Sequence, residues 1–175
     1  MNYHMIRTED MLNGDGLRVV VFLSMCDHGC FGCHNPETWT GVGSKQFDDD
    51  AIQKIYSELD KDYISGITLS GGDPLNATNL DGVYELIVDI KKRYSNKNIW
   101  LYTGYTWEEI VKDDNRYKIA KMCDVVVDGR FIKELADVNY PWAGSTNQRV
   151  IDVHATLATG NKVVISRLYF EKEKG

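Results

Sequence analysis

The sequence has few prolines, no long apolar run and no excess of positive charge. Only three of the 175 residues are proline and 43 % are hydrophobic, which indicates an ordered domain and not a disordered chain. No apolar run approaches the roughly 20 residues of a membrane-spanning helix, and the opening MNYHMIRTED lacks the pattern of a signal peptide. The net charge is −6, so the chain lacks the surplus of basic residues that is typical of nucleic-acid-binding proteins. We therefore expect a cytoplasmic domain that binds neither nucleic acid nor membrane.

Cysteine is scarce and unevenly placed. Three of the four cysteines, Cys26, Cys30 and Cys33, fall within one short segment. A secreted disulfide-bonded protein would spread its cysteines to join distant segments, whereas clustered cysteines in a reducing compartment more often hold a metal or a cluster. Cys123 stands alone before an apolar run, and we expect it to be a small buried hydrophobic residue.

Apolar runs that alternate with helical spacing predict an α/β fold. We expect strands at Arg18–Met25, Ile64–Ser70, Asn98–Thr103 and Asp124–Val127, further strands at Arg149–Val153 and Lys162–Phe170, and a frayed tail at 171–175. Helices are expected after a cap at Asp48 or Asp49, from Leu80 to Tyr94, and from Trp107. The chain is too short for a full eight-unit barrel of about 250 residues. The pattern favours a shortened, open (partial) βα barrel with a mostly parallel sheet.

Unusual residues follow the ends of the four central predicted strands. The cysteine segment follows the first, Gly71-Gly72-Asp73 the second, Thr103-Gly104-Tyr105 the third and Asp128-Gly129-Arg130 the fourth. The carboxyl ends of parallel strands lie at one edge of a sheet, where α/β folds assemble their sites. We therefore expect these four segments to meet in space.

The segment CDHGCFGC, residues 26–33, has the spacing CxxxCxxC. Three thiolates on one tight loop can bind three corners of a cubic 4Fe–4S cluster, because thiolate is a soft ligand that suits iron. With only three cysteines, one iron stays open to an exogenous ligand, by the same logic that leaves catalytic zinc an open position. The spacing also permits a structural zinc ion with His28 or His34 as fourth ligand, although no second cysteine pair is present.

The turn at Gly71, Gly72 and Asp73 could hold a second ligand. Paired glycines at a strand end permit close approach of a ligand to the backbone, and the Asp73 carboxylate could accept a hydrogen bond from an ammonium group. Next to a three-cysteine loop, this turn suits an amino-acid-like molecule that chelates the open iron while the turn holds its amino group.

The two motifs together resemble those of the radical S-adenosylmethionine superfamily, and more closely those of the activating proteins of anaerobic (class III) ribonucleoside-triphosphate reductase. The similar residues lie between 1 and about 150. They include Asn13-Gly14, Gly16, Arg18, the cysteine loop through Asn35, Thr38-Trp39, LSGGDPL at 69–75, Trp100, Thr103-Gly104-Tyr105, VDGRF at 127–131, Gly144-Ser145 and Asn147-Gln148.

The resemblance implies a role for each matched residue. Cys26, Cys30 and Cys33 would ligate a 4Fe–4S cluster, whose fourth iron would be chelated by the methionine end of S-adenosylmethionine. The cofactor-binding residues would be Gly32, Cys33, His34, Gly71, Gly72, Asp73 and Thr103. The reduced cluster would cleave S-adenosylmethionine to a 5′-deoxyadenosyl radical, which would abstract a hydrogen atom from a glycine of the reductase. The electron would come from a reduced flavodoxin-type donor.

Residues 1–150 would form this activase domain, and residues 151–175 an extension of unknown role. A short domain without lid segments favours a protein substrate, because a large partner could close the site against solvent. The alternatives are an activase of another glycyl-radical enzyme, a small radical enzyme acting on a metabolite, a zinc-stabilised binding module, and an electron-transfer iron–sulfur protein.

Overall fold

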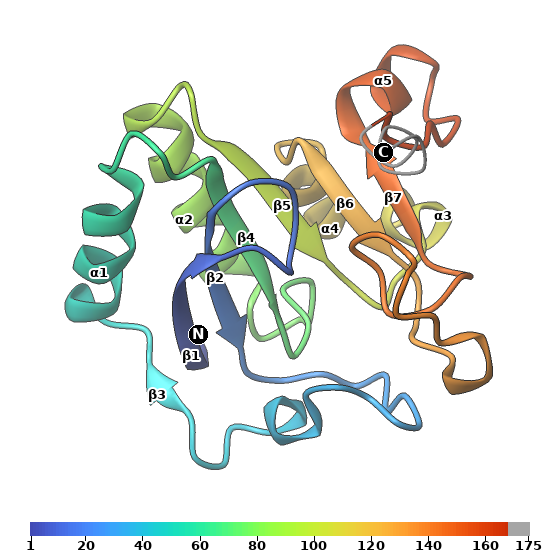
Figure 1. Ribbon diagram of the computed structural model, residues 1–175, viewed down its shortest axis with the longest axis horizontal. Coiled ribbons are helices and arrows are strands. Elements are labelled where there is room, and N and C mark those ends of the chain that lie inside the picture. Colours follow the sequence, from blue (N-terminus) through green and yellow to red (C-terminus); the bar gives the residue numbers. More distant parts are fainter. Residues whose placement is uncertain (168–175) are drawn as a thin grey trace.

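A computed structural model describes residues 1–167. Within this range seven strands form one open sheet in the order β3-β1-β2-β4-β5-β6-β7 (Figure 1). The strands are β1 (Asn2–Asp10), β2 (Arg18–Leu23), β3 (Lys45–Gln46), β4 (Gly66–Gly71), β5 (Asn98–Tyr102), β6 (Val125–Asp128) and β7 (Arg149–Asp152). The helices are α1 (Asp49–Leu59), α2 (Leu80–Arg93), α3 (Trp107–Ile110), α4 (Asp114–Ala120) and α5 (Val153–Ala158), with 3-10 turns at Pro36–Trp39 and Lys133–Leu135.

The four central strands are parallel, and the strands outside them pair in antiparallel fashion. β2, β4, β5 and β6 pair in parallel, so their carboxyl ends lie at one edge of the sheet. In Figure 1 this is the lower edge, where the loop after β2 and the long segment between β6 and β7 extend beyond the strands. β1 pairs with β2, and β7 with β6, in the opposite direction. The α/β class and the parallel centre of the sheet are confirmed.

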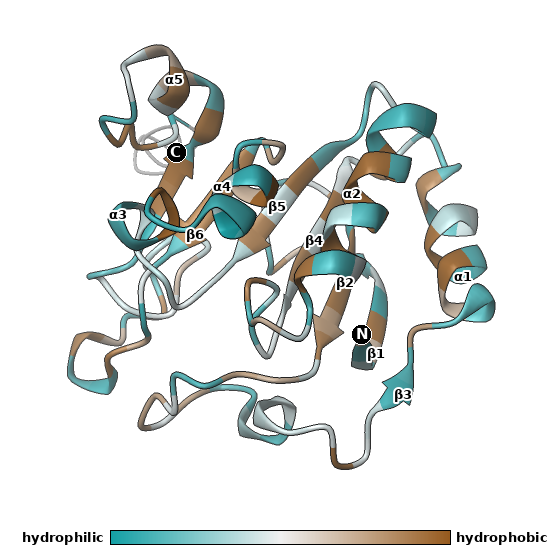
Figure 2. Cartoon of the chain, turned by 180° about the vertical axis from the view of Figure 1, so that it is seen from behind, coloured by the Kyte–Doolittle hydropathy of each residue, from teal (hydrophilic) through white to brown (hydrophobic). Residues whose placement is uncertain are grey.

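Helices cover one face of the sheet. Figure 2 shows α2 and α4 in front of the strands, with apolar stripes on helices whose outer surfaces are polar. Val19, Val21 and Leu23 of β2 belong to the large core that includes residues of these helices. The continuous apolar run of β2 is completely buried, as expected for a strand covered on both faces.

The opposite face of the sheet is more polar and contains a buried arginine. Arg18 donates hydrogen bonds to Thr68 Oγ1 at 2.8 Å and to the Asp15 carbonyl at 2.9 Å, and its guanidinium lies over the Trp100 ring. Burial lowers the pKa of Arg18 to about 10, which still leaves it charged at neutral pH. Arg18 thereby ties the loop between β1 and β2 to the middle of β4. Phe22 lies on the same face and lines an open cleft.

The helix starts follow the expected capping rules. Asp48 accepts a hydrogen bond from the backbone N–H of Ala51 at 3.0 Å, which confirms it as the cap of α1. The helical segment expected from Trp107 is divided in two, because Thr106 caps α3 and Asp113 caps a separate helix α4. No helix in residues 1–167 is long and apolar enough to span a membrane.

Three expectations need correction or qualification. The strand expected at Lys162–Phe170 is wrong for residues 162–167, where the structure has only an isolated bridge between Ile165 and Ile151; residues 168–170 and the tail at 171–175 lie outside the described residues. The sheet is open, as expected, but the partial barrel stays a prediction. β1 and β3 lie outside the expected strands, and β7 corresponds to an expected strand but pairs in antiparallel fashion. The expected domain boundary at residue 150 falls within β7 and stays a prediction.

Candidate functional site

The cysteine loop leaves the sheet through a strained residue. Met25 has φ of 77°, a left-handed conformation that is uncommon for a side chain larger than glycine and that recurs at functional sites. Its N–H donates to the Thr38 carbonyl at 2.8 Å, and the N–H of Cys26 donates to the Trp39 carbonyl at 3.1 Å. These bonds hold the first residues of the loop against the turn that follows the cysteines.

The three loop cysteines are free and half-buried. Burial raises the pKa of the Cys26 thiol to about 11, and the charges of Asp73 and of the other two cysteines act in the same direction. Gly29 and Gly32 have φ of 58° and 74°, a conformation that glycine adopts without strain and that lets the loop fold back on itself. The backbone N–H of Cys33 closes the turn on the carbonyl of Cys30. One loop therefore carries all three predicted cluster ligands at the carboxyl end of β2.

The glycine turn after β4 packs directly against the base of this loop. A Cβ at Gly71 would lie 2.5 Å from the backbone nitrogen of Leu23, and a Cβ at Gly72 would lie 2.5 Å from the carbonyl oxygen of Met25. The Gly72 N–H donates to Leu23 and the Asp73 N–H to Met25, both at 2.7 Å. The paired glycines are thus required for the two segments to touch backbone to backbone.

The Asp73 carboxylate joins three of the four strand ends. Its Oδ2 accepts hydrogen bonds from Thr103 Oγ1 at 2.9 Å and from the Gly104 N–H at 3.0 Å, and it lies 2.6 Å from His28 Nε2. Its Oδ1 accepts from the Leu75 N–H at 2.8 Å. The side chain is 1 % exposed, so protein groups satisfy a buried carboxylate at both oxygens. The structure thereby brings together the segments after β2, β4 and β5, as the sequence predicts.

The two histidines of the cysteine loop have different surroundings. His28 is turned inward to Asp73, whereas His34 is exposed and its ring lies 4.9 Å from that of Phe131. In residues 1–167, no three His, Cys, Asp or Glu side chains are close enough together to bind one metal ion. The two histidines therefore differ in what they contact, Asp73 for His28 and Phe131 for His34.

An open cleft of about 920 Å³ lies beside the cysteine loop. Cys33, His34 and Asn35 line one side of it, and Ser70 and Tyr102 come from the sheet. The rest of the lining comes from Phe131, residues 136–144 and Gln148, together with Met11 and Leu12 of the loop between β1 and β2. The polar face of the sheet therefore forms the floor of a cleft that reaches a predicted cluster ligand.

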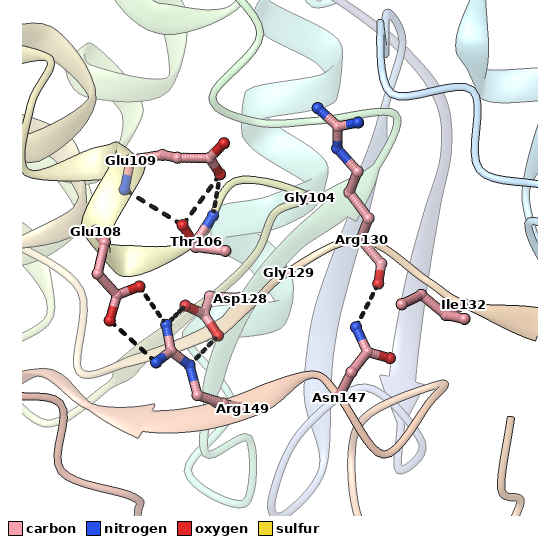
Figure 3. Close-up of a pocket in the computed structure, with 10 residues that line it drawn as sticks. All are labelled: Gly104, Thr106, Glu108, Glu109, Asp128, Gly129, Arg130, Ile132, Asn147 and Arg149. Carbon is pink, nitrogen blue, oxygen red and sulfur yellow. Dashed lines mark hydrogen bonds and ion pairs between the residues drawn. The ribbon is translucent and has the colours of Figure 1, made fainter. Parts of the chain in front are cut away.

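A smaller cavity of about 470 Å³ lies at the ends of β5 and β6 and contains none of the three loop cysteines (Figure 3). There the Arg149 guanidinium lies between Asp128 and Glu108, at 2.5 Å and 2.7 Å. Asp128 also accepts from the Trp107 N–H at 2.7 Å. Hydrogen bonding to Arg149 lowers the pKa of Glu108. This cluster fixes the fourth strand end against α3 and β7, and Figure 3 shows the Arg130 side chain directed away from it.

Sequence reasoning missed the inward contact of His28 and the wall formed by Phe131 and residues 136–144. His28 entered only as a possible zinc ligand, and the wall has no regular apolar spacing that would have marked it. The available signal was the position of Asp73 and Thr103 at adjacent strand ends. It predicts the contact between these two residues but not the contact of Asp73 with His28.

Comparisons with known proteins agree with this geometry. A family model described as a 4Fe-4S single cluster domain matches residues 12–151. The chain thus belongs to the 4Fe-4S single cluster domain family.

Named relatives specify the family further. The anaerobic ribonucleoside-triphosphate reductase-activating protein of Vibrio cholerae serotype O1 is 41 % identical over 150 residues, which cover 85 % of this chain and 96 % of that protein. The protein of the same name from Enterobacteria phage T4 is 40 % identical, with 86 % and 93 % covered, and that from Escherichia coli K12 is 36 % identical, with 86 % and 97 % covered. The chain belongs to the family of anaerobic ribonucleoside-triphosphate reductase-activating proteins, which confirms the resemblance.

Proposed function

We propose that the chain is a cytoplasmic radical S-adenosylmethionine enzyme that installs a glycyl radical on anaerobic ribonucleoside-triphosphate reductase. The observation that carries the proposal is the contact between the three-cysteine loop and the Gly71-Gly72-Asp73 turn, in a chain of this family. The open sheet, with helices on one face and an open cleft on the other, suits a shortened βα barrel whose inner face lines the cleft.

Cys26, Cys30 and Cys33 would hold the 4Fe–4S cluster, and three free thiols on one glycine-containing loop fit this role. When bound and reduced by a flavodoxin-type donor, the cluster would supply one electron that splits S-adenosylmethionine into methionine and a 5′-deoxyadenosyl radical. This radical would take a hydrogen atom from a glycine of the reductase, giving 5′-deoxyadenosine and the glycyl radical.

The remaining site residues would orient S-adenosylmethionine. Gly71, Gly72 and Asp73 would receive its amino end through the main chain of the turn, because the Asp73 carboxylate already accepts hydrogen bonds from protein groups. Thr103 would hold Asp73 in place, as its hydroxyl does in the structure. Gly32 and His34 would border the cofactor on the exposed side of the loop, which the open cleft reaches at His34.

A protein substrate suits the open cleft. A radical has to be kept from solvent during the reaction, and the exposed apolar residues Met11, Leu12 and Val138 on the cleft lining would be covered by a large partner. A glycine of the partner carries no side chain, so its Cα could approach the cysteine loop closely.

The test is an anaerobic activation assay. The chain is reconstituted with iron and sulfide, reduced with dithionite, and mixed with S-adenosylmethionine and the reductase. We expect 5′-deoxyadenosine together with a glycyl radical signal on the reductase, and loss of both in Cys30→Ala. Cofactor cleavage without a radical on the reductase would point to another glycyl-radical enzyme or to a metabolite. A colourless protein that retains zinc and forms no 5′-deoxyadenosine would refute the proposal.

A further inference from the structure

The His28 side chain is buried, although the residues of its loop are half-buried or exposed. Its side chain is 5 % exposed, although it lies between two half-buried cysteines, and its Nε2 is 2.6 Å from Asp73 Oδ2. The edge of its ring meets Tyr105, with ring centroids 4.6 Å apart. The imidazole therefore enters the space between the ends of β4 and β5 and bonds to the carboxylate that joins them.

The chain makes room for this ring at Gly104. A Cβ at Gly104 would lie 2.3 Å from His28 Cδ2, which is well inside van der Waals contact. Gly104 does not have a positive φ, so its backbone does not itself require glycine. Position 104 is therefore glycine because the His28 ring occupies the space that a side chain would need.

The first half of the cysteine loop is fastened to the segments that follow β4 and β5, whereas the second half contacts Phe131 and Lys133 of the segment that follows β6. Asp27 Oδ2 accepts a hydrogen bond from Asn76 Nδ2 at 2.8 Å, next to the contact of His28 with Asp73. Beyond His28 a Cβ at Gly29 would meet nothing within 4 Å. Asp27 and His28 therefore connect the loop to the segment that follows β4, and His28 alone of the two reaches β5.

We propose that His28 is a positioning residue, which fastens the cysteine loop to the Asp73 carboxylate so that the cluster ligands and the Gly71–Asp73 turn keep one relative geometry. The inference rests on the proposed function, in which S-adenosylmethionine bridges the cluster and this turn. A ligand that contacts two segments binds more tightly when both are already aligned, because binding does not have to order them. Loss of the His28 contact therefore weakens S-adenosylmethionine binding while the three cysteines remain.

The test measures binding by spectroscopy as well as activity. The variants are His28→Ala, His28→Gln, Gly104→Ala and the double variant of His28→Ala with Gly104→Ala. His154→Ala is the matched control, because His154 also pairs with an aspartate, Asp124, but on the surface. Each full-length chain is reconstituted anaerobically, its iron and sulfide contents are determined, and the electron paramagnetic resonance spectrum of the reduced cluster is titrated with S-adenosylmethionine.

We expect half-maximal spectral change in His28→Ala to need at least about tenfold more S-adenosylmethionine than in the wild type, as for loss of a hydrogen bond to a charged group. His28→Gln restores part of the affinity, because its amide can donate to Asp73. Gly104→Ala displaces the ring and resembles His28→Ala, and the double variant is no worse than His28→Ala, because the displaced ring is absent. His154→Ala behaves as the wild type.

The inference is overturned if His28→Ala or Gly104→Ala binds S-adenosylmethionine as tightly as the wild type. It is also overturned if the two losses of affinity add up in the double variant. If His28→Ala does not fold, the comparison of His28→Gln and Gly104→Ala with the wild type decides between the same outcomes. A wild-type cluster whose spectrum does not respond to S-adenosylmethionine refutes the proposed function itself, which is a different result from equal responses in all chains.

Discussion

Replacing Asp73 by asparagine tests whether its carboxylate holds the site together. The change keeps the shape of the side chain but turns one oxygen into an N–H donor. Because Oδ2 faces three donors and Oδ1 faces one, the amide oxygen is best placed at the Oδ2 position. The amide nitrogen then faces the N–H of Leu75, and two donors oppose each other in a buried place.

The size of the effect follows from these contacts. An unsatisfied buried donor costs about 1–3 kcal/mol, and each of the three remaining hydrogen bonds loses about 1 kcal/mol when its acceptor is no longer charged. The neutral amide is less costly to bury than the carboxylate, which offsets part of the sum. We expect Asp73→Asn to lower the free energy of unfolding by about 3 kcal/mol, or the melting temperature by about 6–12 °C for a chain of this length.

The assay is thermal and urea unfolding of the cluster-free chain at neutral pH under reducing conditions. Asp124→Asn is the control, since that carboxylate is 31 % exposed and accepts from the Ile99 N–H and His154 near the surface. We expect the control to cost less than about 1 kcal/mol. Equal stability of the two variants would refute the role of Asp73 as the group that joins the strand ends.

Two further predictions concern thiol reactivity and pH. Cys123 is completely buried and burial raises the pKa of its thiol, so a thiol reagent should modify only the three loop cysteines of the native cluster-free chain and reach the fourth on unfolding. Rapid reaction of all four thiols in the native chain would contradict the burial of Cys123. Hydrogen bonding to Arg149 lowers the pKa of Glu108 from its usual 4.5, so the pair stabilises the fold above that pH and this stabilisation is lost as the pH falls through the lowered value. Glu108→Gln should therefore be less stable than the wild type at pH 7, by under about 1 kcal/mol for this exposed pair, and the difference should disappear in acid. If the melting curves of Glu108→Gln and the wild type show the same difference in stability at every pH, the charge of Glu108 is not the cause of that difference.

The central strands could be predicted because their sequences are unambiguous. β2 contains an uninterrupted apolar run, Val19–Leu23, that is completely buried, and β4, β5 and β6 end at glycine-containing or polar turns. β1 was missed, because Ile6 and Asp10 are its only buried residues and its polar positions do not alternate regularly with apolar ones. Its place beside β2 is set by antiparallel pairing, which sequence spacing alone does not reveal.

The site was predictable in its position but not in its contacts. Parallel strands bring their carboxyl ends to one edge, and this rule correctly joined the segments of Cys26, Asp73 and Thr103. The contact between His28 and Asp73 spans 45 residues and depends on the left-handed turns of the loop and on the space left at Gly104. A polar contact between two loops has no periodicity, so only the folded structure could assign it.

The most direct test of the central claim follows a hydrogen atom from the partner to the product. The reductase is prepared with deuterated glycine, and the reduced, reconstituted chain is mixed with it and S-adenosylmethionine. If the chain generates a radical that acts on a glycine of the reductase, the 5′-deoxyadenosine formed carries one deuterium, and its mass rises by one unit together with the glycyl radical signal. Unlabelled 5′-deoxyadenosine alongside a glycyl radical would contradict direct abstraction from that glycine.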